Sequence, residues 1–354
     1  MNMNNDSSVQ LSINSLTQSA DWFVHNVDAN MQATLYPMTA ASYNASIFLD
    51  SRIALQPGAG TTMLNFKDLC GLFPNVAAQQ TRYLFHISHV GSTLISRLLG
   101  CKMQVLSLRE PILLRWMSGF KTLLDKPESR IDTATYQAFL AATQGLLSRP
   151  LGIADQVIVK ATSFTNNIAQ DMLTMQPEAR AVGIYSRLDA FVATILKGTS
   201  GWSDISELCS IRLKRLHDLL GREPWQLSQM GPGEIAAMSW LAEMATLSQA
   251  ASAHGSRYIW FDFDAYLAKP NEHFSDLCHH LKLNWTDQNN RAVEESGLSS
   301  RYSKDSNVTF GSENRQMLIT NIISHHSTEI SKARNWVERA VSIHPELANL
   351  NAFI

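Results

Sequence analysis

A short run near residue 90 combines a histidine, one glycine and two hydroxyl side chains. Residues 82–88 predict a buried strand, His89–Thr93 a tight turn, and the residues from Ser92 onward an amphipathic helix. This order places backbone N–H groups and two hydroxyls at a helix N-terminus, where an anion is stabilised. The run lacks the lysine of a Walker A sequence, which argues against an ordinary ATPase or GTPase. A plain helix N-terminus after a buried strand would give the same pattern.

Further strands are predicted beyond this turn, and helical sequence separates them: 104–108, 156–160, 181–185 and 258–261. Strands that alternate with helices are typical of a parallel sheet with right-handed crossovers. Ligands of such sheets bind at the carboxyl ends of the strands. Glu110, Lys160 and Arg187 each stand at the end of a predicted strand. We therefore expect them to share one edge of the sheet with the turn.

The composition is that of a globular protein with a sizeable core. The 354 residues are 45% hydrophobic and 17% charged, and the formal net charge is −2. The balanced charge and the lack of a long basic run argue against a nucleic-acid partner. We expect a three-layer α/β/α fold with a central, mostly parallel sheet and a helical N-terminal addition. Residues 1–75 would form this addition, packed on an α/β domain of residues 76–354.

Cysteine spacing and segment polarity indicate a reduced, cytoplasmic protein. The four cysteines stand far apart without a CxxC pair, so neither a disulfide framework nor a zinc site is expected: Cys70, Cys101, Cys209 and Cys278. The polar N-terminal residues show no secretory signal, and no apolar run is long enough to span a bilayer. Adjacent histidines do not share a helix face, so no metal is expected. A membrane partner is not expected either.

Three segments resemble the sulfotransferase family, whose members use 3′-phosphoadenosine 5′-phosphosulfate (PAPS). His89-Val90-Gly91-Ser92-Thr93 resembles the family's 5′-phosphosulfate-binding loop, which usually has Lys or Arg at the position of His89 and Ser at that of Val90. Residues 260–270 resemble a family strand followed by Tyr-Glu-Asp-Leu and a proline, and residues 274–285 resemble the helix after it. The resemblance covers roughly residues 81–310, about two thirds of the chain. It implies a P-loop-related fold and PAPS as donor.

The resemblance also implies roles for residues of the loop and of two strand ends. Residues His89–Thr93, Val90 included, would hold the 5′-phosphosulfate through backbone amides and hydroxyls. Glu110 matches a catalytic glutamate and would remove the proton of the acceptor hydroxyl. Lys160 and His89 would steady the leaving 3′-phosphoadenosine 5′-phosphate (PAP). No metal is required, because a sulfate ester carries less charge than a phosphate.

The residues that would contact the 3′-phosphate match the family's motif only in part. Arg187 resembles the first residue of the family motif, in which a serine follows about eight residues later. Here that position is Ile195, and Thr194 precedes it by one residue. Arg301 and Lys304 would replace the family's late basic segment at the 3′-phosphate.

Each candidate residue also has a purely structural interpretation. His89 could hydrogen-bond to the backbone of the turn, and Glu110 could complement the dipole of the next helix. Lys160 could extend to solvent, and Arg187 could pair with Asp189 or another carboxylate.

The function implied is transfer of a sulfuryl group from PAPS to a hydroxyl or amine. Two alternatives stay open. A nucleotide-dependent small-molecule kinase would need Mg²⁺ and prefer ATP, whereas a non-catalytic nucleotide-binding protein would bind without turnover. The acceptor pocket is expected from residues 116–143 and 199–233, and the sequence names neither the acceptor nor the oligomeric state.

Overall fold

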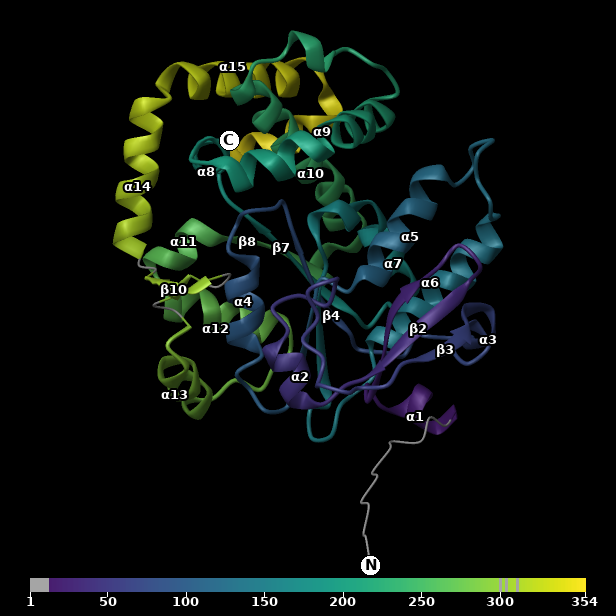
Figure 1. The fold of residues 1–354 in the computed structure, drawn as a ribbon. Coiled ribbons are helices and arrows are strands. Elements are labelled where there is room, and N and C mark those ends of the chain that lie inside the picture. The colour runs from purple at the N-terminus through teal and green to yellow at the C-terminus, as the bar shows by residue number, and fades with distance from the viewer. Residues whose placement is uncertain (1–12, 299–300, 303–304, 310–311) are drawn as a thin grey trace, which may run out of the picture.

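The centre of the molecule is a five-stranded parallel sheet (Figure 1). The computed structural model describes residues 13–298, 301–302, 305–309 and 312–354. All five strands predicted from the sequence are confirmed, within two residues at each end: β4 (Arg82–His86), β5 (Val105–Arg109), β6 (Gln156–Lys160), β7 (Arg180–Tyr185) and β8 (Tyr258–Asp262). Because helices cover both faces of a parallel sheet, its strands are apolar runs. Every residue of β4 and β5 is buried.

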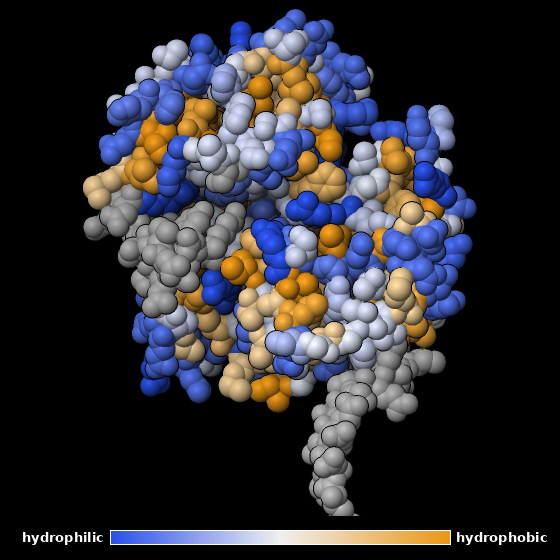
Figure 2. All heavy atoms as spheres, in the orientation of Figure 1, coloured by the Kyte–Doolittle hydropathy of each residue, from blue (hydrophilic) through white to orange (hydrophobic). Residues whose placement is uncertain are grey.

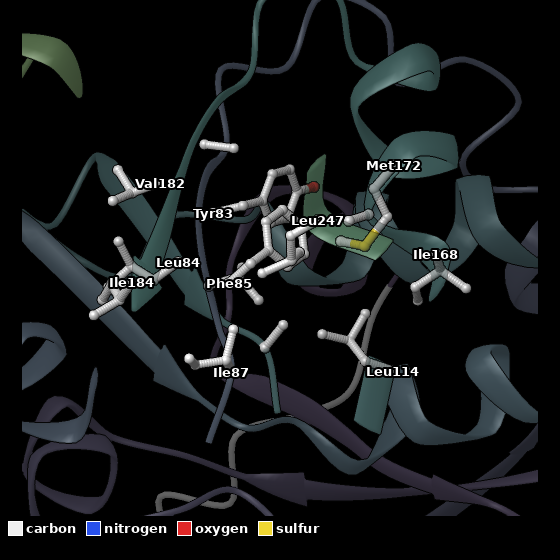
Figure 3. Close-up of a cluster of buried hydrophobic side chains, with 14 of the residues drawn as sticks. Tyr83, Leu84, Phe85, Ile87, Leu114, Ile168, Met172, Val182, Ile184 and Leu247 are labelled. Carbon is white, nitrogen blue, oxygen red and sulfur yellow. The ribbon is translucent and has the colours of Figure 1, made fainter. Parts of the chain in front are cut away.

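Helices pack on both faces, which gives the α/β/α layering expected from the sequence. On one face α4 (Ser92–Leu99) contacts β4, β5 and β6. The opposite face is covered by α5 (Ile112–Leu123), α6 (Thr133–Leu147), α7 (Ala169–Met175), α10 (Pro232–His254) and the 3₁₀ segment η1 (Ser163–Ile168). Successive side chains of β4 point to opposite faces of the sheet. Figure 3 shows the side chains of Tyr83 and Phe85 directed toward Met172 and Leu247, whereas Leu84 lies with Val182 and Ile184.

The strand order fixes where a ligand site belongs. The order is β5-β6-β4-β7-β8. The chain passes from β4 to β5, returns to β6, and then crosses β4 to reach β7. Its connections therefore diverge to opposite sides of β4, and the carboxyl end of β4 is the topological switch point where such sheets bind ligands. Residues 87–91, which join β4 to α4, lie at this point.

The N-terminal addition differs from the helical one expected. It contains a three-stranded antiparallel sheet as well as short helices: α1 (Ile13–Gln18), β1 (Trp22–Val27), β2 (Gln32–Pro37), α2 (Ala40–Ala45), β3 (Thr62–Asn65) and α3 (Phe66–Cys70). The buried Arg109 guanidinium donates to Tyr43 O and Ser46 O at the end of α2, and so satisfies carbonyls that the helix leaves open. The buried Arg149 guanidinium donates to Leu16 O and Trp22 O. The boundary near residue 75 stays a prediction.

The C-terminal half surrounds the β7–β8 side of the sheet. Figure 1 shows α14 and α15 along the outside of this half. Its elements are α8 (Leu188–Leu196), α9 (Thr199–Leu220), α11 (Phe263–Ala268), α12 (Pro270–His280), α13 (Asp287–Ser296), β9 (Arg301–Tyr302), β10 (Asp305–Thr309), α14 (Ser312–His325) and α15 (Ser327–Ile343). Across the described part of the chain, no helix is long and apolar enough to cross a membrane. All four cysteines are free thiols.

Candidate active site

The loop between β4 and α4 has an unusual backbone. Ser88, His89 and Gly91 have φ values of 75°, 50° and 70°, in the left-handed region. A side chain at such a position costs about 1–2 kcal/mol, so contacts elsewhere must hold Ser88 and His89 in place. The Val90 side chain is fully buried, which leaves only its backbone for a ligand. Ser92 and Thr93, the first residues of α4, are 4% and 3% exposed.

Phe263 of α11 explains why residue 91 is glycine. A Cβ atom at this position would lie 2.0 Å from Cζ of the Phe263 ring. The positive φ and the close approach of the ring both require glycine here. Phe263 therefore covers one side of the loop and fixes its path into α4.

We expect Gly91→Ala to lower the free energy of unfolding by about 2–4 kcal/mol, the sum of backbone strain and overpacking. Gly58→Ala is the matched control, because Gly58 has a φ of 77° and no atom within 4 Å of the point that a Cβ atom would occupy. Strain alone predicts a loss of about 1 kcal/mol there. Urea unfolding measures both variants, and equal losses would show that the Phe263 contact is unimportant.

A carboxylate from α9 holds the loop. Ser88 Oγ donates to Asp204 Oδ2 over 2.9 Å, and His89 Nε2 lies 3.7 Å from the same oxygen. The partner of His89 is therefore a carboxylate on a distant helix rather than the backbone of the turn. Burial alone would raise the pKa of Asp204. Hydrogen bonds and charges from His89, Arg212 and Ser88 outweigh it and hold this pKa well below its usual range.

Behind Asp204 lies a buried network that joins four elements. Arg212 Nη2 lies 3.4 Å from Asp204 Oδ2, and Arg212 Nε donates to Glu243 Oε1 over 2.9 Å. Asn166 Nδ2 donates to Glu243 Oε2 over 2.8 Å and to the carbonyl oxygen of His86 over 3.0 Å. Arg212 and Glu243 are each only 1% exposed. The network thus ties α9, α10 and η1 to the end of β4.

The lowered pKa of Asp204 predicts a specific acid dependence. A carboxyl group whose pKa is lower in the folded state stabilises that state above about pH 4, and this contribution disappears as the pH falls. Between pH 6 and pH 3 the free energy of unfolding should fall in wild type and should fall less in Asp204→Asn. The difference should be about 1 kcal/mol, with solvent screening taken into account. Denaturant titrations at both pH values measure this. Asp218→Asn, at the exposed end of α9, is the control and should follow wild type.

Glu110 and Lys160 are brought together at the carboxyl ends of β5 and β6, as expected. The Lys160 ammonium group forms an ion pair with Glu110 Oε1, and the Glu110 N–H donates to Lys160 O over 2.7 Å. The Lys160 side chain is 1% exposed, so the interpretation that it extends to solvent is wrong. Glu110 has a φ of 53° and a side chain that is 12% exposed. A strained, partly accessible carboxylate on a rigid strand end is typical of a functional position.

His86 is a site residue that the sequence analysis missed. Its Nε2 lies 3.9 Å from Glu110 Oε1, while its Nδ1 accepts a hydrogen bond from the Ser88 N–H over 3.0 Å. A neutral ring that accepts at Nδ1 carries its hydrogen on Nε2, which faces the carboxylate. The imidazole beside Glu110 is therefore His86, and His89 is the one that pairs with Asp204. The one available signal was a polar residue at the end of a strand whose central residues, 83–85, are all large and apolar or aromatic.

The N-terminal addition closes one side of this pair. Lys160 Nζ lies 5.5 Å from the centre of the Phe48 ring, and the Arg52 guanidinium carbon lies 3.9 Å from the same ring. Arg52 also pairs with Asp50. Residues 48–52 were not among the segments predicted to form the acceptor pocket. Their place beside Lys160 follows from long-range packing, which no local pattern reveals.

Among the described side chains, neither Arg187 nor Thr194 forms a hydrogen bond or ion pair with the loop. The Arg187 side chain is 60% exposed, and its Nε lies 3.9 Å from Asp262 Oδ2. Arg187 therefore pairs with another carboxylate, one of the two structural alternatives, whereas Asp189 pairs with Arg334. The Thr194 hydroxyl donates to Ala190 O within α8. Arg301 lies in β9, but its side chain, like Lys304, is outside the described residues.

The structure is similar to several solved sulfotransferases. The sulfotransferase domain from the curacin biosynthetic pathway has 13% identity and a TM-score of 0.39, over 62% of this chain and 78% of that one. The corresponding domain of the Synechococcus PCC 7002 olefin synthase has 10% identity and a TM-score of 0.39, over 72% and 97%. A Mycobacterium avium sulfotransferase has 10% identity and a TM-score of 0.40, over 73% and 80%. No protein-family model and no curated protein matches the chain.

A cavity of about 1030 Å³ lies away from these residues. It is lined by the N-terminal addition, including Tyr43 and Gly58, and by Lys102, Val105 and Leu106. The last two residues begin β5, so this cavity is at the amino ends of the strands. The candidate site is at the opposite, carboxyl ends, and the two are separate.

Proposed function

We propose that the protein is a PAPS-dependent sulfotransferase that acts on a hydroxyl or amine. The observation that carries the proposal is the Glu110–Lys160 ion pair beside the strained β4–α4 loop, at the switch point of the sheet. A carboxylate for proton removal and a cation for charge neutralisation lie next to a loop suited to an anion. Such groups supply most of the catalysis of a transfer reaction through position and charge.

The donor groups around the loop suit the anionic end of PAPS. The α4 N-terminus offers backbone N–H groups from Gly91, Ser92 and Thr93, and two of these residues add hydroxyls. Lys160 contributes a cation at the neighbouring strand end. When bound, PAPS supplies a sulfuryl group attached to a phosphate leaving group. Arg187, Thr194, Arg301 and Lys304 are proposed for the 3′-phosphate, and a cytoplasmic location is part of the same proposal.

Glu110 is proposed as the general base. One of its carboxylate oxygens, Oε1, faces Lys160 and His86, which fixes the orientation of the group. The second oxygen, Oε2, is then the one to accept a proton from the acceptor. The left-handed backbone of Glu110 turns the residue out of β5, and the hydrogen bond from its N–H to Lys160 O keeps that turn in place.

Calorimetry with PAP, and separately with ATP and Mg²⁺, tests the choice of donor. We expect PAP to bind at least tenfold more tightly than ATP–Mg²⁺, and Thr93→Val to weaken PAP binding. Thr122→Val is the control, because its hydroxyl donates to Ser118 O inside α5, away from the loop. Tighter binding of ATP–Mg²⁺ would favour a kinase. Binding of PAP without sulfuryl transfer to any acceptor would favour a non-catalytic nucleotide-binding protein.

A further inference from the structure

The carboxylates around the candidate site are already matched by cations. Asp50 pairs with Arg52, Glu110 with Lys160, and Asp204 and Glu243 share Arg212. Two arginines that lie against the same strand ends take no part in these pairs. They are Arg115 of α5 and Arg215 of α9.

Arg215 is a largely buried cation with hydrogen-bonding capacity to spare. Its Nη2 donates to Phe164 O over 2.5 Å and lies 3.4 Å from Ser118 Oγ, but its buried Nε and Nη1 have no hydrogen-bond partner. Within the described residues, no carboxylate oxygen lies within 4.0 Å of it. Burial lowers its pKa, and Glu243, whose charge acts against this shift, is already bonded to Arg212 and Asn166. The guanidinium carbon lies 5.2 Å from the centre of the Phe164 ring, but a buried cation without an anionic partner is costly, and a bound anion would lower that cost.

Arg115 lies close by and is exposed. Its single described hydrogen bond is a long one, 3.5 Å from Nη2 to Thr162 Oγ1, and it too has no carboxylate within 4.0 Å among the described residues. Thr162 and Phe164, the contacts of the two arginines, are two and four residues after Lys160. Ser118, which contacts Arg215, follows Arg115 by three residues, so it lies on the same side of α5. Both guanidinium groups therefore flank the turn that follows β6.

We propose that the acceptor is a small organic anion whose carboxylate, phosphate or sulfate group binds between Arg115 and Arg215. The inference rests on the proposed function and adds the class of acceptor. Planar guanidinium groups offer paired donors that match such anions. In the view of Figure 2, the middle of the molecule is hollowed, and hydrophilic side chains gather there.

The position of the arginines assigns them to the acceptor rather than to the donor. Arg187, proposed for the donor, lies on the β7 side of the loop, whereas Arg115 and Arg215 flank the end of β6 on the other side. An acceptor anchored there would present its hydroxyl toward Glu110. Its oxygen then bonds to sulfur as the bond from sulfur to the phosphate oxygen breaks, and Glu110 takes the proton.

Anion binding is tested first without relying on turnover. With PAP saturating, 10 mM sulfate should raise the midpoint of thermal unfolding by about 2 °C over chloride of equal ionic strength. Arg115→Gln and Arg215→Gln should each remove most of this rise, whereas Lys214→Gln, on the exposed side of α9, should keep it. A rise that survives both arginine substitutions, or no rise in wild type, would overturn the proposal. If Arg215→Gln does not fold, Arg115→Gln decides.

Turnover then tests the acceptor class with a matched pair, 4-hydroxyphenylacetate and its neutral amide. Wild type should prefer the acid in kcat/KM by about tenfold or more, and each arginine substitution should abolish this preference. The Kd of PAP should change less than threefold in both variants. A tenfold weakening of PAP binding would assign the arginines to the donor and contradict the proposal. If PAP does not bind wild type, the proposed function fails, while an arginine-dependent sulfate effect would still support the anion site.

Discussion

Replacing Glu110 with glutamine is expected to lower kcat for sulfuryl transfer by about 100- to 10,000-fold, the range typical of a lost general base. Glutamine keeps the size of the side chain and one oxygen to face Lys160, but it cannot accept a proton from the acceptor. The affinity for PAP should stay within a few-fold of wild type, because the donor is held by the loop after β4, and β6 separates that strand from β5. Single-turnover kinetics and PAP titration separate the two effects.

The control is Glu128→Gln, which changes an exposed glutamate in the segment between α5 and α6. This variant should have wild-type kinetics. Full activity in Glu110→Gln would remove the carboxylate from the mechanism and leave the Glu110–Lys160 pair as a structural contact. Loss of PAP binding together with activity would instead mean that the pair shapes the donor site.

The second large effect is expected in the buried network behind the loop. Arg212→Met should reduce the free energy of unfolding by about 3–5 kcal/mol, because Glu243 is then left buried without its cation. The double variant Arg212→Met/Glu243→Leu should recover part of this loss, since no charge is stranded. Urea unfolding of both singles and the double gives the coupling energy.

The same variants report on the loop. Asp204 loses its contact with Arg212 in Arg212→Met, so PAP affinity should fall even where the protein remains folded. Lys332→Met, which breaks an exposed pair with Glu329, is the control and should change neither property appreciably. Simple additivity of the Arg212 and Glu243 substitutions would contradict a coupled buried pair.

The central sheet could be predicted because its strands are continuous apolar runs between helical segments. For example, the strand predicted for residues 156–160 has the same first and last residues as β6. The meeting of Glu110 and Lys160 followed from the rule that parallel strands end at one edge. The three-stranded N-terminal sheet was missed because two of its strands lack regular alternation. Three consecutive residues of the six in β1 are buried, and none of the four residues of β3 is.

The partners of the site residues could not be predicted, because they come from distant parts of the chain. Asp204 meets Ser88 across 116 positions, and Phe263 meets Gly91 across an even longer separation. Neither contact leaves a local pattern. The separate roles of His86 and His89 also could not be resolved without the backbone, because the left-handed turn at Ser88 sends the two rings to different carboxylates.

The contact between residue 49 and the end of β5 bears on self-association. β5 is one of the two edge strands of the parallel sheet, and an edge strand offers free N–H and C=O groups to the strands of other molecules. The Leu49 N–H donates to Arg109 O, and Leu49 O accepts from the Ile112 N–H. These two hydrogen bonds satisfy backbone groups at and just after the end of β5 with residue 49 of the same chain. The N-terminal addition therefore blocks intermolecular strand pairing at the carboxyl end of this edge.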